Sequence, residues 1–333
     1  MPQKSDDLPT KRKDWQRAFD AAREALLGLP AAIRPVRRDG EPGALIELDP
    51  GLPCLILPDL HARPAVLDAL ESWLIPPQTA GSEPRTVRDA LEAGRIQVVM
   101  LGDGPHSEGL AGKERWRAAW LEYQEGWKTD AAMREEMSLA FTAMAHVSRL
   151  VAAYPGRFFF LKGNHDNIRN REGEGDHPYG KFASEGEMAA DWTFRILGAD
   201  FFETYAAFED TLPLMARGGG FLACHAEPAF PLSVEEVVNA RLDGDIVEAL
   251  TWTDIGQAVE GAVEETFRSF FSESVKPGVM IGGHRPSRER FYLRADGRFI
   301  QIHNAALMQA AFILPGQPFD PWSGIVSLGE PAS

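Results

Sequence analysis

The chain has 333 residues, of which 44% are hydrophobic and 25% are charged, and its formal net charge at neutral pH is −15. These proportions are ordinary for a globular protein with a sizeable core. The acidic excess argues against a nucleic-acid partner, because such binding depends on Lys and Arg that neutralise phosphates. No apolar N-terminal stretch predicts a signal peptide and no long apolar run predicts a membrane span, so a cytoplasmic location without membrane contact is expected. The sequence gives no indication of the oligomeric state.

Residues 1–43 are predicted to form an N-terminal extension that carries one helix. Residues 1–12 are polar and are expected to be frayed. Apolar residues at helical spacing predict a helix over about 13–28, and the turn formers of 34–43 predict a loop.

Strands and helices alternate in the next part of the chain. Apolar runs predict strands over 44–48, 52–57, 95–101 and 157–161, and helical spacing predicts helices over 65–74 and over 113–153, with a break near 128–130. The unbroken apolar character of 95–101 indicates burial on both faces of a sheet. Residues 167–190 are polar, rich in glycine and without periodicity, which favours an insertion over a pocket.

The second half of the chain is predicted to be richer in strands. These strands are expected over 204–209, 212–216, 220–224, 279–282, 290–294 and 299–303, with helices near 233–242 and 258–272. The run Gly218–Gly220 indicates a hairpin turn. We therefore predict a single α/β domain over 44–330, in which two mixed β-sheets pack face to face between flanking helices as a four-layer α/β/β/α sandwich.

The two cysteines, Cys54 and Cys224, both lie in apolar stretches that are predicted to be buried strands. We expect two buried free thiols. A disulfide between them is the less favoured alternative. Cys224 adjoins His225, but neighbouring side chains of a strand point to opposite faces, so a thiol nucleophile activated by this histidine is not expected.

Six short polar motifs occur in one order, and five of them begin where an apolar run stops. They are Asp59-Leu60-His61, Gly102-Asp103, Gly163-Asn164-His165-Asp166, Cys224-His225-Ala226-Glu227, Gly282-Gly283-His284-Arg285 and Ile302-His303-Asn304. In open α/β sheets ligands bind at the carboxyl ends of strands, so these motifs are expected to converge. Carboxylate, amide and imidazole ligands without thiolate favour Mn²⁺, Fe or Zn²⁺. A pair of such ions is typical of enzymes that split phosphate esters.

Most of these motifs have an ordinary structural interpretation when taken alone. Asp59-Leu60-His61 could be a loop with an Asx turn, and Asp103 could cap a helix. The most specific motif is Gly163–Asp166, in which glycine permits a sharp turn. Asn164 there offers a neutral oxygen to an ion, and His165 can hold a proton near neutral pH, as a general acid must.

The ordered motifs resemble the pattern of the calcineurin-like metallophosphoesterase superfamily over roughly residues 44–305. The closest similarity is to the branch that holds the Ser/Thr protein phosphatases and the bacterial diadenosine tetraphosphate hydrolases. Two further segments carry it: Leu250-Thr251-Trp252-Thr253-Asp254 is similar to a W-S-D segment, and His225-Ala226-Glu227-Pro228 to an H-A-G segment. The resemblance implies the metallophosphoesterase fold and a hydrolase of phosphoric ester bonds. It also implies two divalent metal ions, with Mn²⁺ favoured over Fe or Zn²⁺.

The resemblance also implies roles for individual residues. The first ion would be held by Asp59, His61 and Asp103, and the second by Asp103, Asn164, His225 and His284. His165 would assist the leaving group, and Asp166 and Arg285 are further candidate catalytic residues.

The expected reaction is hydrolysis of a phosphate ester or anhydride by direct attack of a metal-bridging hydroxide. A phosphatase is favoured, acting on a small phosphorylated substrate or a phosphoprotein. The alternatives are a non-catalytic binding scaffold with this fold and a phosphodiesterase or nuclease of the same superfamily.

The chain departs from the superfamily pattern in two places. Pro286 stands where many members have a histidine that binds the first ion, and His303 is a candidate to fill that gap, the alternative being a strand residue near the rim. His106 and Ser107 stand where the branch has an aspartate that orients the catalytic histidine and an arginine that grips phosphate. Another basic residue must therefore grip phosphate. The candidates are Arg285, ranked first because it adjoins a ligand, and Arg169, Arg171 and Lys162.

Overall fold

The central strands are apolar on both faces, as strands covered from both sides must be. In β2 (Cys54–Leu57), Cys54 and Ile56 lie in a core between two sheets, whereas Leu55 and Leu57 pack against helices on the outer face. Strand β8 (Phe221–Cys224) of the other sheet alternates in the same way between the inner core and a second outer core. This alternation follows from the two-residue period of a strand, and it produces four layers.

The computed structural model of the protein describes residues 8–77, 85–271 and 278–329. One sheet has the order β13-β12-β2-β5-β6, in which the other four strands are Ile325–Ser327, Gln309–Ile313, Gln97–Met100 and Phe158–Phe160. The second sheet has the order β1-β7-β8-β9-β11-β10, in which the other five strands are Leu45–Glu47, Met215–Arg217, Val279–Gly282, Phe299–Gln301 and Tyr292–Arg294. Short strands β3 (Leu74–Ile75) and β4 (Arg85–Thr86) pair separately.

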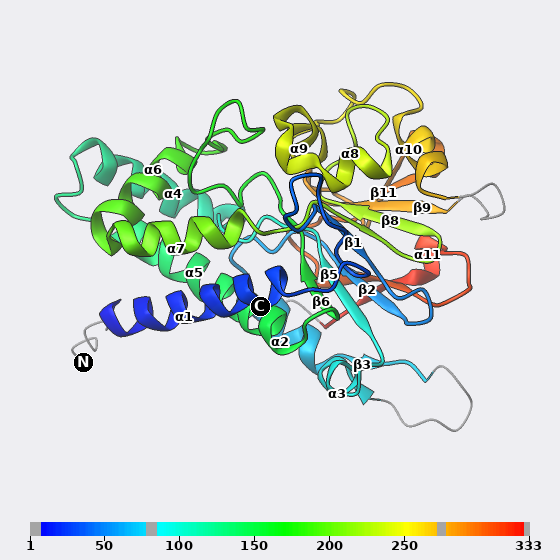
Figure 1. Cartoon of the computed structure of the whole chain (residues 1–333). Coiled ribbons are helices and arrows are strands. Elements are labelled where there is room, and N and C mark those ends of the chain that lie inside the picture. The colour runs from blue at the N-terminus through cyan, green and yellow to red at the C-terminus, as the bar shows by residue number, and fades with distance from the viewer. Residues whose placement is uncertain (1–7, 78–84, 272–277, 330–333) are drawn as a thin grey trace.

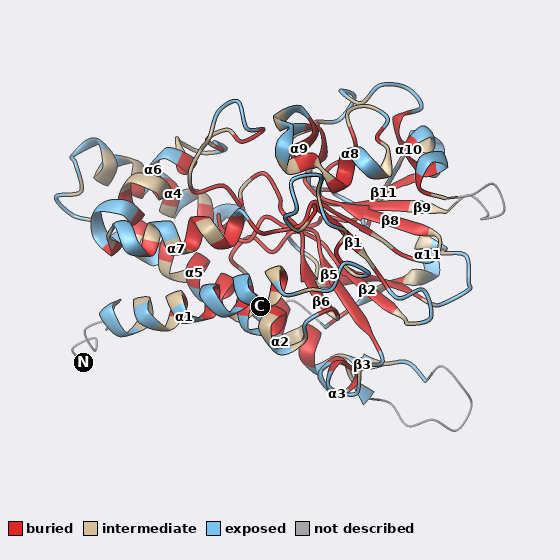
Figure 2. Ribbon diagram, viewed as in Figure 1, coloured by how far each residue is buried: buried red, intermediate tan, exposed pale blue. Residues whose placement is uncertain are grey.

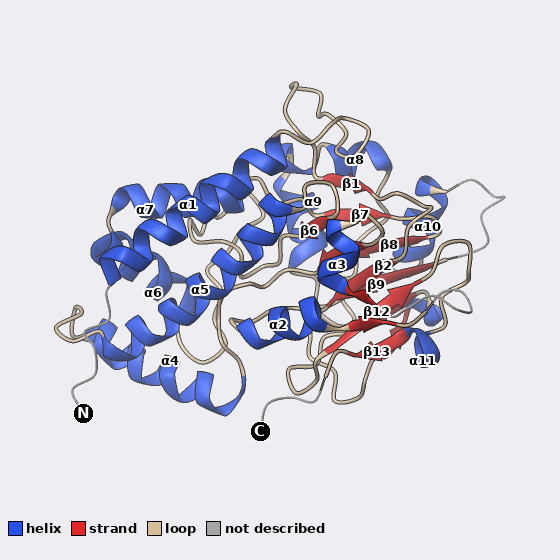
Figure 3. Ribbon diagram, turned by 90° about the horizontal axis from the view of Figure 1, so that it is seen from below, coloured by secondary structure: helices blue, strands red, loops and turns tan. Residues whose placement is uncertain are grey.

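Helices cover the outer faces of both sheets (Figures 1 and 3). One apolar core joins the five-stranded sheet to a group of helices: α1 (Leu8–Leu27), α2 (Pro64–Ser72), α3 (Val87–Glu92), α4 (Gly109–Gln124), α5 (Ala131–Ala153), α6 (Glu185–Trp192) and α7 (Ala199–Glu209). A smaller core joins the six-stranded sheet to α8 (Val234–Val238), α9 (Gly244–Thr251) and α10 (Ala262–Phe270). The short helix α11 (Pro321–Gly324) lies beside β12 and β13. The predicted α/β/β/α sandwich of two mixed sheets is confirmed.

The strand directions bring the polar motifs to one edge of the sandwich. Strands β2, β5 and β6 are parallel to one another, and so are β8, β9 and β11 in the other sheet. Each of the six motifs follows or ends one of these six strands, so the motifs gather where the carboxyl ends of both sheets meet. This region is buried in the middle of the molecule (Figure 2).

Most predicted elements are present, with boundaries that differ by a few residues. The break between α4 and α5, the hairpin between antiparallel β7 and β8, and the two buried free cysteines are confirmed. Helices α3 and α9 and strands β12 and β13 were not predicted. No helix in the described ranges is both long and apolar enough to cross a membrane.

The predicted strand over 204–209 is wrong, because these residues belong to α7. Phe201, Tyr205 and Phe208 are buried at helical spacing on one face of this helix. An apolar run this short does not distinguish strand from helix by periodicity alone.

The N-terminal segment and the insertion also differ from expectation. Helix α1 already begins at Leu8, so residues 8–12 are helical and not frayed, while residues 1–7 of that prediction lie outside the described residues. The insertion over 167–190 is irregular at first but ends in α6, which begins at Glu185.

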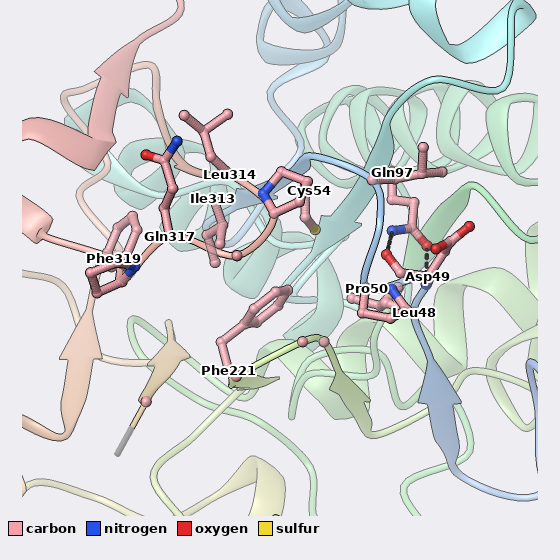
Figure 4. A pocket seen from close by; sticks show the side chains of 18 of the residues that line it. Leu48, Asp49, Pro50, Cys54, Gln97, Phe221, Ile313, Leu314, Gln317 and Phe319 are labelled. Atoms are coloured by element: carbon pink, nitrogen blue, oxygen red, sulfur yellow. Dashed lines mark hydrogen bonds between the residues drawn. The ribbon is translucent and has the colours of Figure 1, made fainter. Parts of the chain in front are cut away.

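A cavity of about 360 Å³ opens between the two sheets at the end of the sandwich opposite to the motifs (Figure 4). Its lining includes Phe221, Phe319 and Cys54, and the Gln97 side chain at its edge exchanges hydrogen bonds of 2.8 and 2.9 Å with the Asp49 backbone. Cys54, Gln97 and Phe221 begin β2, β5 and β8, whose far ends carry polar motifs. The cavity is therefore separate from the candidate site.

Candidate metal centre

The predicted metal ligands come from both sheets. Asp59 and His61 follow β2, Asp103 follows β5 and Asn164 follows β6, while His225 and His284 follow β8 and β9 of the six-stranded sheet. A hydrogen bond joins the two groups directly, because the backbone N–H of His284 donates to Asp59 Oδ2 at 2.9 Å. All six side chains are buried, and the structure brings them into one cluster.

One half of the cluster is formed by Asn164, His225 and His284. Asn164 Oδ1 lies 3.0 Å from His225 Nε2 and 3.0 Å from His284 Nδ1, and these two nitrogens are 3.2 Å apart. Asp103 Oδ1 lies 3.5 Å from His225 Nε2. Such separations suit donor atoms that surround one ion at bond lengths of about 2 Å.

The other half of the cluster surrounds His61. Its Nε2 lies 3.7 Å from Asp59 Oδ2 and 3.8 Å from Asp103 Oδ2. Asp103 thus directs one carboxylate oxygen to each half, which is the geometry that a bridging ligand requires. Asp59, His61 and His303 form one group of close donor atoms, and Asp59, Asp103 and His225 form another.

Backbone carbonyls fix the rings of two of these histidines. His61 Nδ1 lies 3.0 Å from the carbonyl oxygen of His106, and His225 Nδ1 lies 2.7 Å from that of Leu101. A carbonyl only accepts, so each Nδ1 must carry the proton and each Nε2 keeps its lone pair free. Metal-binding histidines are held in this way in other proteins.

Several atoms of the cluster lack a hydrogen-bond partner among the described residues. They are Asp59 Oδ1, His61 Nε2, His165 Nδ1, His284 Nε2 and His303 Nδ1. A buried polar atom without a partner costs ~1–3 kcal/mol, so several in one place need an explanation. Coordination of a cation by Asp59 and His61 would satisfy two of these atoms, Asp59 Oδ1 and His61 Nε2. The side chains present therefore fit a pair of metal ions held by oxygen and nitrogen.

The titration of the cluster agrees with this fit. Burial lowers the pKa of His61 to about 4 and, with the charge of His225, holds the pKa of His284 well below its ordinary value. Both rings are therefore neutral near neutral pH, as ligands must be. Burial and the charges of Asp59 and Asp166 raise the pKa of Asp103 well above its ordinary value. An ionised Asp103 beside these two carboxylates therefore requires positive charge nearby.

Comparison with known proteins gives a match of structure without a match of sequence. No protein-family model matches the chain, and no curated protein resembles it in sequence. A solved structure of a protein serine/threonine phosphatase from Saccharomyces cerevisiae, described as similar to human phosphatase PP5, matches with a TM-score of 0.56 and 11% identity. The match covers 95% of this chain and 88% of that one.

The chain has the calcineurin-like metallophosphoesterase fold. The resemblance seen in the motifs is thus confirmed at the level of fold. Two cold-active protein tyrosine phosphatase structures, the second from a Shewanella species, match with TM-scores of 0.44 and 0.42 at 12% and 11% identity. The matches cover 86% and 81% of this chain and 78% and 77% of those chains.

In this metallophosphoesterase fold, His165 lies at the rim of the cluster. Its backbone N–H donates to Asp103 Oδ1 at 2.9 Å, and its ring stacks on Tyr179 with centroids 4.4 Å apart. The ring of His106, which stands where the branch has an aspartate, lies edge-on at 4.6 Å. Burial, followed by the charges of His106 and His61, holds the pKa of His165 well below its ordinary value in the ion-free protein.

Asp166 connects the loops that carry two ligands. Its carboxylate accepts hydrogen bonds from the backbone N–H groups of Asp103 at 2.8 Å, Gly104 at 2.9 Å and Gly163 at 2.8 Å. Both carboxylate oxygens are used in this way. Asp166 was expected to be catalytic. Its contacts instead favour a positioning role, in which it holds the loop of Asp103 and the loop of Gly163 that carries Asn164.

The four candidates for gripping phosphate are all paired with acidic residues. Arg285 donates to Asp254 at 2.8 Å and is 43% exposed. The other pairs are Arg169 with Glu203, Arg171 with Glu174, and buried Lys162 with Asp176. One further basic residue, Lys181 of the insertion, was not predicted from the sequence. It also pairs with an acidic residue, Glu108, but at the edge of the cluster.

Two further residues of the site were missed from the sequence. The side chain of Glu108 lies beside the cluster and is only 8% exposed, with Oε1 3.7 Å from His61 Nε2. In the sequence it is simply an acidic residue in the polar segment after Asp103. Arg63 donates to the carbonyl oxygens of Asp59, Leu60 and Ala305. It thereby fixes the loop that carries the first two ligands. In the sequence, Arg63 is marked only by its position two residues after His61.

Proposed function

We propose that the protein is a dinuclear-metal-dependent phosphoesterase that hydrolyses a phosphate ester or anhydride, acting as a phosphatase. The observation that carries this proposal is the position of Asp103, whose two oxygens face two separate groups of buried donor atoms. The fold shared with a Ser/Thr phosphatase supports the same chemistry. Mn²⁺ is the favoured ion, with Fe or Zn²⁺ as alternatives, since the donor atoms are oxygen and nitrogen.

When bound, the two ions supply Lewis acidity toward the phosphoryl oxygens and activate water for direct in-line attack on phosphorus. Asp103 keeps the two halves of the site at a fixed separation. The backbone bonds to His61 and His225 hold the free Nε2 atoms in place before binding, which avoids reorganisation during the reaction.

The proton for the leaving group is proposed to come from His165. The ring lies beside Asp103 at the more exposed rim of the cluster, with 12% of its side chain accessible, and the stacking on Tyr179 restrains its orientation. A covalent thiol route is disfavoured, because burial raises the pKa of the Cys224 thiol and its sulfur donates to the carbonyl oxygen of Ala226.

The proposed substrate is a small phosphorylated molecule or a phosphoprotein. The structurally similar protein from Saccharomyces cerevisiae is a protein serine/threonine phosphatase, and a phosphoprotein is therefore one of the two substrate classes proposed here. His106 and Ser107 replace two residues of the protein phosphatase pattern, so the grip on phosphate must differ here.

The test is turnover of model substrates by protein stripped of metal and then reloaded. We expect Mn²⁺ to restore hydrolysis of p-nitrophenyl phosphate, and hydrolysis of bis(p-nitrophenyl) phosphate to be slower. Elemental analysis should give two ions per chain. Two bound ions without turnover of any phosphate substrate would instead indicate a binding scaffold, and a preference for the diester would indicate a phosphodiesterase or nuclease.

Asp103→Asn tests the bridging role directly. The variant should lose both ions or their coupling, and with them the phosphatase activity, because the amide offers only one good ligand oxygen. Asp20→Asn, an exposed change of the same kind on α1, is the matched control and should behave as the unmodified protein. Full activity with two ions in the Asp103 variant would contradict the proposal.

A further inference from the structure

The two halves of the candidate metal centre have unequal sets of expected ligands. Asp103, Asn164, His225 and His284 surround the second position. Only Asp59, His61 and Asp103 were expected at the first, because Pro286 stands where many members of the superfamily have a further histidine.

His303 lies where that missing ligand is needed. It follows β11 (Phe299–Gln301) in the six-stranded sheet and is fully buried. Its Nδ1 lies 3.7 Å from Asp59 Oδ2, and its ring centroid is 5.0 Å from that of His61. The donor atoms of Asp59, His61 and His303 all lie within 4.8 Å of one another.

The far side of the His303 ring is held by a carboxylate. His303 Nε2 lies 3.1 Å from Glu108 Oε2, and Nδ1 has no hydrogen-bond partner among the described residues. A carboxylate accepts, so it places a proton on Nε2 and leaves Nδ1 directed at Asp59. Histidines that bind metals commonly donate their second N–H to a carboxylate in this way.

Glu108 is itself anchored on both oxygens. Oε1 pairs with Lys181 from the insertion and lies 3.7 Å from His61 Nε2, while Oε2 receives the bond from His303. The backbone of His303 is held as well, because its carbonyl oxygen accepts from the N–H of Ser287 at 2.7 Å. The ring therefore has one fixed orientation.

His303 lies between two carboxylates, with Nδ1 facing Asp59 and Nε2 facing Glu108. A cation at Nδ1 would offset the negative charge of Asp59.

We propose that His303 binds the first ion through Nδ1 as a fourth protein ligand, and that Glu108 is the residue that positions it. This inference rests on the proposed function, because it requires a site for two ions. It gives the first position the same number of protein ligands as the second, from a part of the chain 17 residues beyond Pro286.

The inference is tested by Mn²⁺ titration of the unmodified protein, His303→Ala and Glu108→Gln, with calorimetry and elemental analysis as readouts. In His303→Ala one of the two ions should bind at least ~100-fold more weakly, with the other unchanged. Glu108→Gln should weaken the same ion by ~10–100-fold, the usual effect of an outer partner. His177→Ala, which removes a 40%-exposed histidine of the insertion, is the control and should retain both affinities.

Substitution with Co²⁺ gives a second readout that does not depend on activity. The visible absorption of the Co²⁺ protein reports the ligands of the ion, so His303→Ala should change the bands of one site only. If His303→Ala does not fold, as circular dichroism would show, the conservative Glu108→Gln variant decides.

The outcomes separate this inference from the proposed function. Unchanged affinities for both ions in the variants, with two ions in the unmodified protein, would overturn the role of His303 and Glu108 alone. Fewer than two ions in the unmodified protein would overturn the dinuclear site itself.

Discussion

His165 is the residue whose role differs most from that of its neighbours in the cluster. It lies beside Asp103 and belongs to neither group of donor atoms around Asp59, although its ring is close to those of His61 and His106. Its ring is oriented by stacking on Tyr179, with the ring centroids 4.4 Å apart.

His165→Asn should lower kcat by ~10²–10⁴, the usual contribution of a general acid, and leave the metal content unchanged. Steady-state kinetics with elemental analysis of the same samples checks this. His146→Asn, a change of the same kind at a histidine paired with Glu71, should have no effect on kcat. An equal loss of metal and activity in the His165 variant would show that this residue is a ligand and not an acid.

Helix α1 is the element that fixes the helical layer over the five-stranded sheet. Phe19 is fully buried, and its ring stacks on Phe208 with centroids 5.6 Å apart and contacts Tyr205 at 4.8 Å. These two residues lie on α7, and Phe141 of α5 adds a third contact. The N-terminal extension is thus packed into the largest core.

Phe19→Ala should lower the free energy of unfolding by ~3–5 kcal/mol, because it leaves a cavity among aromatic rings. Urea unfolding followed by circular dichroism measures this change. Glu24→Ala, at an exposed position of the same helix, should change it by no more than about 0.5 kcal/mol. A similar loss in both variants would show that α1 contributes through its helicity and not through this aromatic contact.

Elements differ in how far their sequence predicts them. Central strands such as β5 were found because a short run without any polar residue has few other interpretations in an α/β protein. Helix α7 was mistaken for a strand, since its apolar residues include several aromatic and alanine side chains that suit either structure. Only its packing against α1 and its ring contacts with Phe141 of α5 show which face is buried.

At the scale of the whole molecule, folding gathers carboxylates and imidazoles from two sheets into one buried site. Burial and the charges of Asp59 and Asp166 raise the pKa of Asp103, so its ionised form destabilises the ion-free protein. That destabilisation is present above the folded-state pKa and is relieved as the pH falls through it. Ions bound at the proposed site would offset it at higher pH.

Removal of the ions should therefore lower the stability of the whole protein, and by less in acid. A ligand at 100 times its Kd adds ~2.7 kcal/mol per site, so chelation should lower the Tm by several degrees near neutral pH. The difference in Tm between samples with Mn²⁺ and with EDTA should shrink as the pH falls from about 8 to about 5, because protons compete for the ligands. Calorimetry over this range checks it, and a constant difference would contradict metal binding at these carboxylates.

The residue types of the candidate site could be predicted from local sequence, because each motif lies at the end of one strand and depends on residues close to it in the chain. The predicted strands and helices, together with the family resemblance of the motifs, were enough to predict a two-sheet fold with candidate oxygen and nitrogen ligands at one edge. Only the tertiary structure decided that His303 and Glu108, 195 residues apart, face each other beside Asp59. Contacts of this kind depend on how two sheets and an insertion pack together, and no local pattern in the chain specifies that packing.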